Sequence, residues 1–142
     1  MNISVISVGK IKEKYLVSGI GEYAKRLSKY CKLNLIEVSD EKCPENLSPA
    51  DMDIVKSKEK ERILKKIPQN TTIITLEIEG KQLTSEDFSK KIDDFGLRGQ
   101  SNLTFLIGGS LGLDDELKNM SDFKLSFSKM TFPHQLMKMI LL

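Results

Sequence analysis

Stretches rich in β-branched residues alternate along this chain with stretches of helical periodicity. Apolar side chains recur at steps of four, three and four in Leu16, Ile20, Tyr23 and Leu27, which is one face of a helix. The strand-like stretches lie at residues 2–8, 32–38, 70–80, 101–110 and 123–130, and the helical ones at 12–30, 50–67, 84–95, 113–120 and 133–142. This alternation predicts an α/β fold with a mostly parallel sheet flanked by helices.

Local signals mark several element ends. Thr84 with Asp87 fits a capping box at a helix start, and Pro133 suits the first position of the last helix. Gly19 and Gly21 each weaken the first helix by roughly 1 kcal/mol relative to alanine. No repeat or linker interrupts the 142 residues, so we expect one domain over residues 1–142.

The composition excludes several classes of protein. No apolar run approaches the roughly 20 residues of a membrane span, and the first residues lack the pattern of a signal peptide, so we expect a cytoplasmic location. Cys31, Cys43 and the only histidine are too few for a zinc site, and we expect two reduced cysteines and no metal. The formal net charge of +2 does not demand a nucleic-acid partner, although local patches remain able to bind one.

A glycine-rich turn follows the fourth predicted strand. In "FLIGGSLGL", an apolar strand ends in Gly108 and Gly109, and Gly112 follows. Ligands of open α/β sheets bind beyond the carboxyl ends of strands, where glycine lets the backbone approach them closely. The segment matches neither a dinucleotide fingerprint nor a phosphate-binding P-loop, and on pattern alone a plain tight turn explains it equally well.

The segment from Phe127 to His134 is a second candidate, because a short loop beside a glycine turn can wrap a small molecule with backbone amides. The alternative is an ordinary strand-to-helix connection capped by Thr131. His134 is a candidate general base, although a lone histidine at a helix start is more often structural. The lysines at 10, 12 and 14 suit either phosphate contacts or a solvated helix start.

Several segments, taken in order, resemble one family over the whole chain. They are "ISVGKIKEKY", "GIGEYAKRLSKY", "IITLEIEGKQLTSEDF", "FLIGGSLGL" and "LSFSKMTFPHQLM". Together they are similar to SPOUT methyltransferases of the RlmH type. Lys138 stands where that family usually has arginine.

The resemblance implies a fold, a reaction and a set of cofactor residues. The fold is an α/β domain with a C-terminal trefoil knot, assembled as a homodimer. The reaction is S-adenosylmethionine-dependent methylation of N3 of a pseudouridine in helix 69 of 23S rRNA, on the assembled ribosome. The family's cofactor-binding residues correspond to Leu76 at the end of the third strand, Gly108, Phe127, Ser128, Lys129, Met130, Thr131 and Phe132.

Members of that family continue beyond the equivalent of Leu142 with a stretch rich in Tyr, Arg and His, which implies that their catalytic residues lie there. We therefore assign no catalytic residue, and we expect the molecule to carry such a tail beyond these residues. The alternative is a chain that ends at Leu142, a catalytically inactive module that binds S-adenosylmethionine or the ribosome. A flavodoxin-like nucleotide binder is a weaker third possibility, because "SVGKIKEK" lacks a Ser/Thr-rich phosphate loop.

Overall fold

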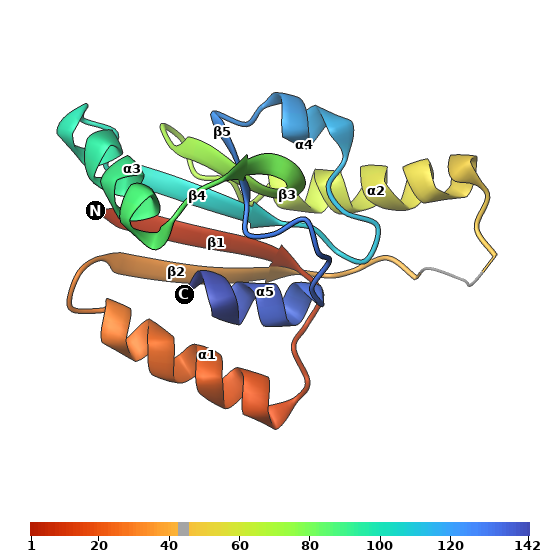
Figure 1. Ribbon diagram of the computed structural model, residues 1–142. Coiled ribbons are helices and arrows are strands. Elements are labelled where there is room, and N and C mark those ends of the chain that lie inside the picture. Colours follow the sequence, from red (N-terminus) through yellow and green to blue (C-terminus); the bar gives the residue numbers. More distant parts are fainter. Residues whose placement is uncertain (43–45) are drawn as a thin grey trace.

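Strands and helices alternate strictly in the computed structural model, which describes residues 1–42 and 46–142 (Figure 1). In chain order the elements are β1 (Asn2–Val8), α1 (Lys14–Leu27), β2 (Lys32–Val38), α2 (Pro49–Leu64), β3 (Thr72–Gln82), α3 (Ser85–Leu97), β4 (Asn102–Ile107), α4 (Asp115–Asn119), β5 (Phe123–Ser126) and α5 (His134–Leu141). Cys31 carries a free thiol. Cys43, also expected to be reduced, lies outside the described residues together with Pro44 and Glu45 of the loop predicted there.

The five strands form one sheet in the order β2-β1-β4-β3-β5, and every neighbouring pair is parallel. The predicted α/β class is therefore confirmed. All strands point the same way, so their carboxyl ends, and the loops that follow them, gather along a single edge of the sheet. The trefoil knot stays a prediction.

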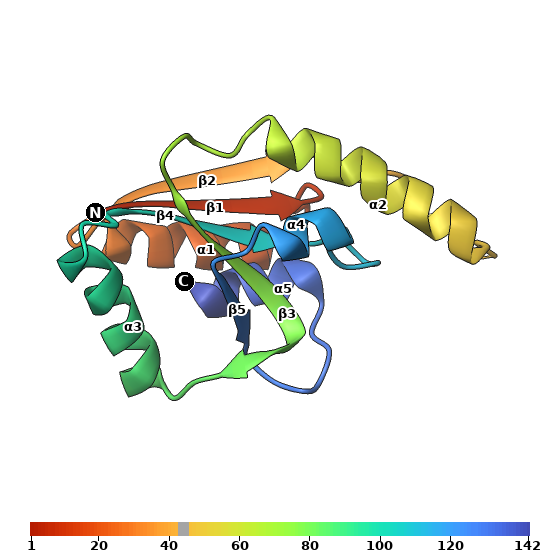
Figure 2. The same cartoon turned by 90° about the horizontal axis from the view of Figure 1, so that it is seen from above.

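Helices cover both faces of the sheet, as Figure 2 shows. Consecutive side chains of a strand point to opposite faces, so Val5 and Ile6, both essentially inaccessible, enter different cores. On the face of Ile6 the core is completed by α2 and α4, through Ile63 and Leu117. On the face of Val5 it is completed by α3 and α5, and α5 lies beside α1 (Figure 1).

The helix starts are fixed by side chains that accept backbone hydrogen bonds. Ser48 and Asp51 form a reciprocal capping box at α2, which the sequence analysis did not identify. At α3, the Thr84 hydroxyl accepts the N–H of Asp87 at 3.0 Å, which confirms that half of the predicted capping box. The helix predicted over residues 12–30 is shorter at both ends, because α1 begins at Lys14 and ends at Leu27.

A glycine that weakens a helix in isolation has a packing role here. A Cβ placed on Gly19 of α1 would lie 2.5 Å from the Met139 methyl carbon of α5. The missing side chain therefore lets α1 and α5 approach each other. Gly21, two positions on, meets no atom within 4 Å and has no such role among the described residues.

Two predicted positions are corrected by the structure. Pro133 was expected as the first residue of the last helix, but its extended ψ of 133° makes it the N-cap, and α5 begins at His134. Leu76 was expected at the end of the third strand, but it lies in the middle of β3, which continues to Gln82 beyond an irregularity. Over residues 1–42 and 46–142, no helix combines the length and apolar character required to cross a membrane.

Candidate cofactor-binding site

A cavity of about 570 Å³ opens where β3, β4 and β5 deliver their loops, a size typical of small-molecule sites. Its walls come from the middle of β3, the glycine turn after β4, the loop after β5 and the start of α5. The lining residues are Leu76–Glu79, Ile107–Leu113, Lys118, Leu125–Ser128, Met130–Phe132, His134 and Met137.

The first wall is a bulge in β3. Leu76 and Lys81 both pair with Leu125 of β5, so the four residues between them leave the ladder. Gly80 permits this, because a Cβ there would lie 2.8 Å from the backbone carbonyl of Lys124. The Ser126 hydroxyl donates to the carbonyl of Ile78 at 2.8 Å and fastens the bulge to β5. Glu77 and Glu79 of the bulge line the cavity, and the Glu77 carboxylate accepts a hydrogen bond from the Thr75 hydroxyl at 2.5 Å.

The second wall is the glycine turn. A Cβ on Gly108 would lie 2.6 Å from the carbonyl carbon of Gly112 and 2.8 Å from the nitrogen of Leu113. Gly112 has a φ of +82°, a left-handed conformation that favours glycine, and its N–H donates to the carbonyl of Gly109 at 3.0 Å. The turn is thus a closed backbone loop without side chains at its tightest points, which leaves main-chain atoms facing the cavity.

The third wall is the loop from Phe127 to Phe132. The Ser128 hydroxyl accepts the N–H of Met130 at 3.0 Å, and Phe127 packs edge-on against Phe88 of α3 at 6.4 Å between ring centroids. The alternative in which Thr131 caps the helix is wrong, because α5 has no side-chain cap and Thr131 lines the cavity instead.

The structure brings together seven of the eight residues that the resemblance assigns to the cofactor. These are Leu76, Gly108, Phe127, Ser128, Met130, Thr131 and Phe132. Lys129 is exposed and does not belong to the cavity wall, because its neighbours on both sides turn toward the cavity in its place. Glu77 and Glu79 were not predicted from the sequence, where the only signal for them was Gly80 within a strand pattern.

His134 lies in the cavity wall at the start of α5 and is half-buried. Burial lowers the pKa of its imidazole below 6.5, and the negative charge of Asp40 offsets part of that effect. Its Nε2 would lie 3.4 Å from a Cβ on Gly9, so the ring also packs against the end of β1. The imidazole is therefore less readily protonated than an exposed one, and it lies beside the loop after β1.

The cavity walls combine apolar side chains with main chain and charged groups. The described residues contain no group of three or more His, Cys, Asp or Glu side chains arranged to hold a metal ion. Apolar side chains such as Leu76 and Phe132, exposed main chain and a few charged groups at the rim suit a flat heterocycle with a polar tail.

The fold and the site together define a class of protein. It is an α/β protein whose small-molecule cavity is lined by backbone and lies at the carboxyl edge of a parallel sheet. A family model described as "Predicted SPOUT methyltransferase" matches residues 1–142. The chain therefore belongs to the SPOUT methyltransferase family, as its motifs indicated.

Three relatives carry the same name, ribosomal RNA large subunit methyltransferase H. The protein from Clostridioides difficile (strain 630) is 59% identical over all of this chain and 89% of its own length. The protein from Exiguobacterium sp. (strain ATCC BAA-1283 / AT1b) is 60% identical over 99% of this chain and 89% of its own length. The protein from Alkaliphilus oremlandii (strain OhILAs) is 58% identical over the same shares as the first.

Proposed function

We propose that this protein transfers a methyl group from S-adenosylmethionine to the RNA of the large ribosomal subunit. The finer assignment is N3 of a pseudouridine in helix 69 of 23S rRNA, on the assembled ribosome. One observation carries the proposal: a chain with 59% identity to a protein named ribosomal RNA large subunit methyltransferase H keeps an open, glycine-lined cavity where a cofactor belongs.

The cavity fits S-adenosylmethionine by size and by the character of its walls. Leu76, Met130 and Phe132 supply apolar surface for the adenine, and the glycine turn leaves main-chain groups free to hydrogen-bond it. The carboxylates of Glu77 and Glu79 complement the positive charges of the sulfonium and the amino group. Gly108 matters most for this fit, because a side chain there would press on the turn itself.

When bound, the cofactor supplies an electrophilic methyl carbon on a sulfonium, and no redox change accompanies its transfer. What the chain would contribute is position: the turn and the bulge would hold the cofactor, and methyl transfer would require its methyl carbon to face the acceptor nitrogen. The proton on N3 must also leave, since only the deprotonated imide is a good nucleophile. We assign no catalytic base; His134, Glu77 and Glu79 are the wall residues able to accept a proton.

The surface around the cavity supports a homodimer. Phe127, Met130, Leu136 and Ile140 are large apolar side chains that stay exposed on one continuous segment, and Met130 is 72% accessible. Exposed apolar side chains concentrated in one segment are typical of a protein interface. Analytical ultracentrifugation is expected to give a dimer, and replacing Leu136 and Ile140 by serine is expected to give monomers.

The near-neutral charge supports recognition of the ribosome rather than of free RNA. With a net charge of +2, the nonspecific attraction to phosphates is small. Shape and contacts available only in the assembled particle must then supply most of the affinity.

The test is methyl transfer from tritiated S-adenosylmethionine to ribosomes that lack the modification, with the product located by mass spectrometry of nuclease fragments. We expect label at N3 of one pseudouridine in helix 69, and much faster transfer to ribosomes than to naked 23S rRNA. Calorimetry with the cofactor alone separates the two failures. Cofactor binding without transfer would indicate the inactive module, and no cofactor binding would refute the proposal.

A further inference from the structure

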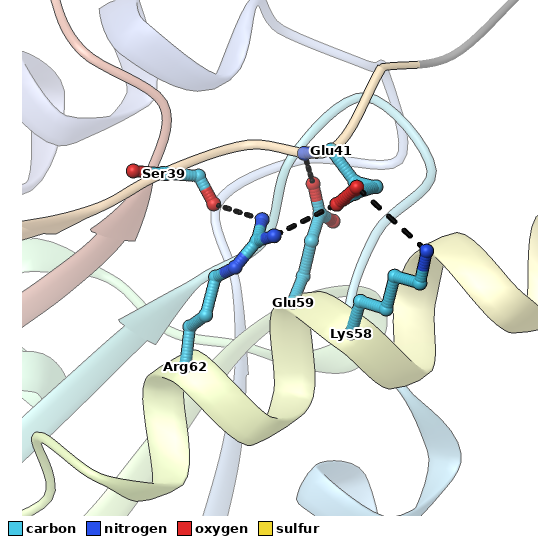
Figure 3. Close-up of polar contacts among 5 residues, drawn as sticks. All are labelled: Ser39, Glu41, Lys58, Glu59 and Arg62. Atoms are coloured by element: carbon cyan, nitrogen blue, oxygen red, sulfur yellow. Dashed lines mark hydrogen bonds and ion pairs between the residues drawn. The ribbon is translucent and has the colours of Figure 1, made fainter.

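A buried carboxylate lies directly behind the glycine turn. Glu59 of α2 is only 5% exposed, and its side chain reaches up to the loop after β2, as Figure 3 shows. Its Oε2 accepts the backbone N–H of Glu41 at 3.0 Å. A Cβ on Gly109 would lie 3.4 and 3.5 Å from the two oxygens, so the same carboxylate lies next to the turn, where it leaves little room for a side chain.

The loop after β2 is clamped onto α2 around this contact. The carboxylate of Glu41 pairs with Arg62 at 2.8 Å and with Lys58 at 3.9 Å, and Arg62 also donates to the carbonyl of Ser39 at 2.9 Å (Figure 3). These ion pairs are partly exposed, and such pairs contribute little to stability. Their main effect is geometric: they fix the loop, and with it the N–H group that holds Glu59 in place.

Burying a carboxylate at this position is unfavourable, because desolvation opposes its charge. Desolvation raises the pKa of Glu59, and the neighbouring Asp40 and Glu41 raise it further against the opposing effects of the Glu41 N–H and of Arg62. An apolar side chain would fill the space at lower cost but would leave the loop N–H without its acceptor. Glu59 therefore joins two segments that an apolar residue would leave independent.

The glycine turn is the second of the two segments that lie next to the Glu59 carboxylate. Val8 of β1 would approach a Cβ on Gly109 to 3.1 Å, so this part of the turn lies close to both the end of β1 and the carboxylate of α2. Gly109 faces the cofactor cavity, whereas Glu59 does not line it. Any influence of Glu59 on a ligand must therefore pass through the turn.

We propose that Glu59 is a positioning residue that fixes the glycine turn, and thereby one wall of the cofactor cavity, relative to α2 and the loop after β2. This inference rests on the proposed function, since it takes the cavity to be the S-adenosylmethionine site. Glu59 acts through Gly109 and touches neither cofactor nor substrate.

Four variants test the role. Glu59→Ala removes the contact, Glu59→Asp withdraws the carboxylate by one methylene, and Glu59→Gln keeps the length and the acceptor for the loop N–H. Glu61→Ala is the matched control, because Glu61 lies on the same helix two residues away and is exposed. The two readouts are calorimetry with S-adenosylmethionine and amide hydrogen exchange of the cofactor-free protein.

We expect Glu59→Ala to raise the Kd for the cofactor by up to about tenfold, the upper limit set by loss of the hydrogen bond that Glu59 accepts from the Glu41 N–H. Glu59→Asp keeps a carboxylate but on a shorter side chain, and it should raise the Kd severalfold. Glu59→Gln and Glu61→Ala should bind the cofactor with close to wild-type affinity. In the cofactor-free protein, Glu59→Ala should accelerate exchange of the Gly112 N–H, which bonds to Gly109, and leave the β1–β2 ladder unchanged.

The two readouts keep failures apart. Wild-type affinity in Glu59→Asp and Glu59→Ala, with unchanged exchange at Gly112, would overturn the positioning role even if both variants lose thermal stability. If Glu59→Ala does not fold, Glu59→Asp against Glu59→Gln decides the question alone. If the wild type binds no cofactor, the proposed function fails, and exchange at Gly112 still supports or overturns the link between Glu59 and the turn.

Discussion

The substitution Gly108→Ala probes the turn at its tightest point. The added Cβ would meet three backbone atoms of Gly112 and Leu113 at 2.6 to 2.9 Å. No side-chain rotation relieves these contacts, because all three atoms belong to the main chain. Restoring an ordinary contact of 3.4 Å requires the Gly112 carbonyl carbon to recede by about 0.8 Å, which opens the turn.

Overpacking of a well-packed region costs about 1–3 kcal/mol, and the absence of a flexible neighbour places this case near the upper end. For a chain of 142 residues, a loss of about 3 kcal/mol lowers Tm by roughly 10 °C. A displacement of nearly 1 Å in a cavity wall is also expected to weaken cofactor binding and to slow methyl transfer by up to about a hundredfold.

Gly21→Ala is the matched control, because it makes the same chemical change in α1, where nothing lies within 4 Å. It should raise the free energy of unfolding by up to about 1 kcal/mol through helix propensity alone. Differential scanning calorimetry and cofactor titration measure both variants. A Gly108→Ala protein with a Tm within 1 °C of wild type, and with the same affinity, would show that the turn is not as rigid as its contacts imply.

Three further predictions concern ionisation. The single histidine, His134, should titrate by NMR below pH 6.5, because burial lowers its pKa. The free energy of unfolding should therefore fall as the pH drops from 6.5 through that pKa, and a measured pKa at or above 6.5 would contradict the burial of the ring. Lys138 is 3% exposed, and burial lowers its pKa despite the nearby charge of Glu37. In urea unfolding at pH 7, Lys138→Met should therefore be more stable than wild type, and this difference should vanish as the pH rises toward 10.5. Burial raises the pKa of Glu59 above 4.5, so Glu59→Gln should be more stable than wild type at pH 7 and should lose that advantage as the pH falls through the raised pKa toward 4.5. Equal urea midpoints of the two proteins at pH 7 and at pH 4.5 would argue against a desolvated carboxylate.

The fold class could be predicted because it depends on local patterns. Runs of β-branched residues separated by helical periodicity specify strands and helices, and five strands joined by helices favour a parallel sheet. The order of the strands could not be predicted, since no local pattern states that β1 lies between β2 and β4. The bulge in β3 was missed for a related reason: residues 77–80 alternate like a strand, and only the pairing with Leu125 shows that they leave the ladder.

Prediction of the candidate site relied on the family motifs more than on periodicity. Gly108 looked equally like a plain turn until its close contacts with Gly112 were visible. Glu59 could not be identified at all, because α2 is charged along most of its length. Its sequence does not reveal that Glu59 points inward while Glu61 faces water; that distinction comes from the loop and turn packed on the helix.

The strand order also determines when each strand can pair during biosynthesis. Asn2 of β1 pairs with Asn102 of β4, so a nascent chain holds β1 next to β2 while its other edge waits for a partner 100 residues away. From Val38 at the end of β2 to Asn102 the ribosome adds 64 residues (102 − 38), so at translation rates of about 5–20 residues per second that wait lasts roughly 3–13 s. During this interval Val5 and Ile6 form part of an open strand edge, the kind of surface that pairs with other chains. Synthesis of β4 closes it, and the walls of the cavity are completed only afterwards.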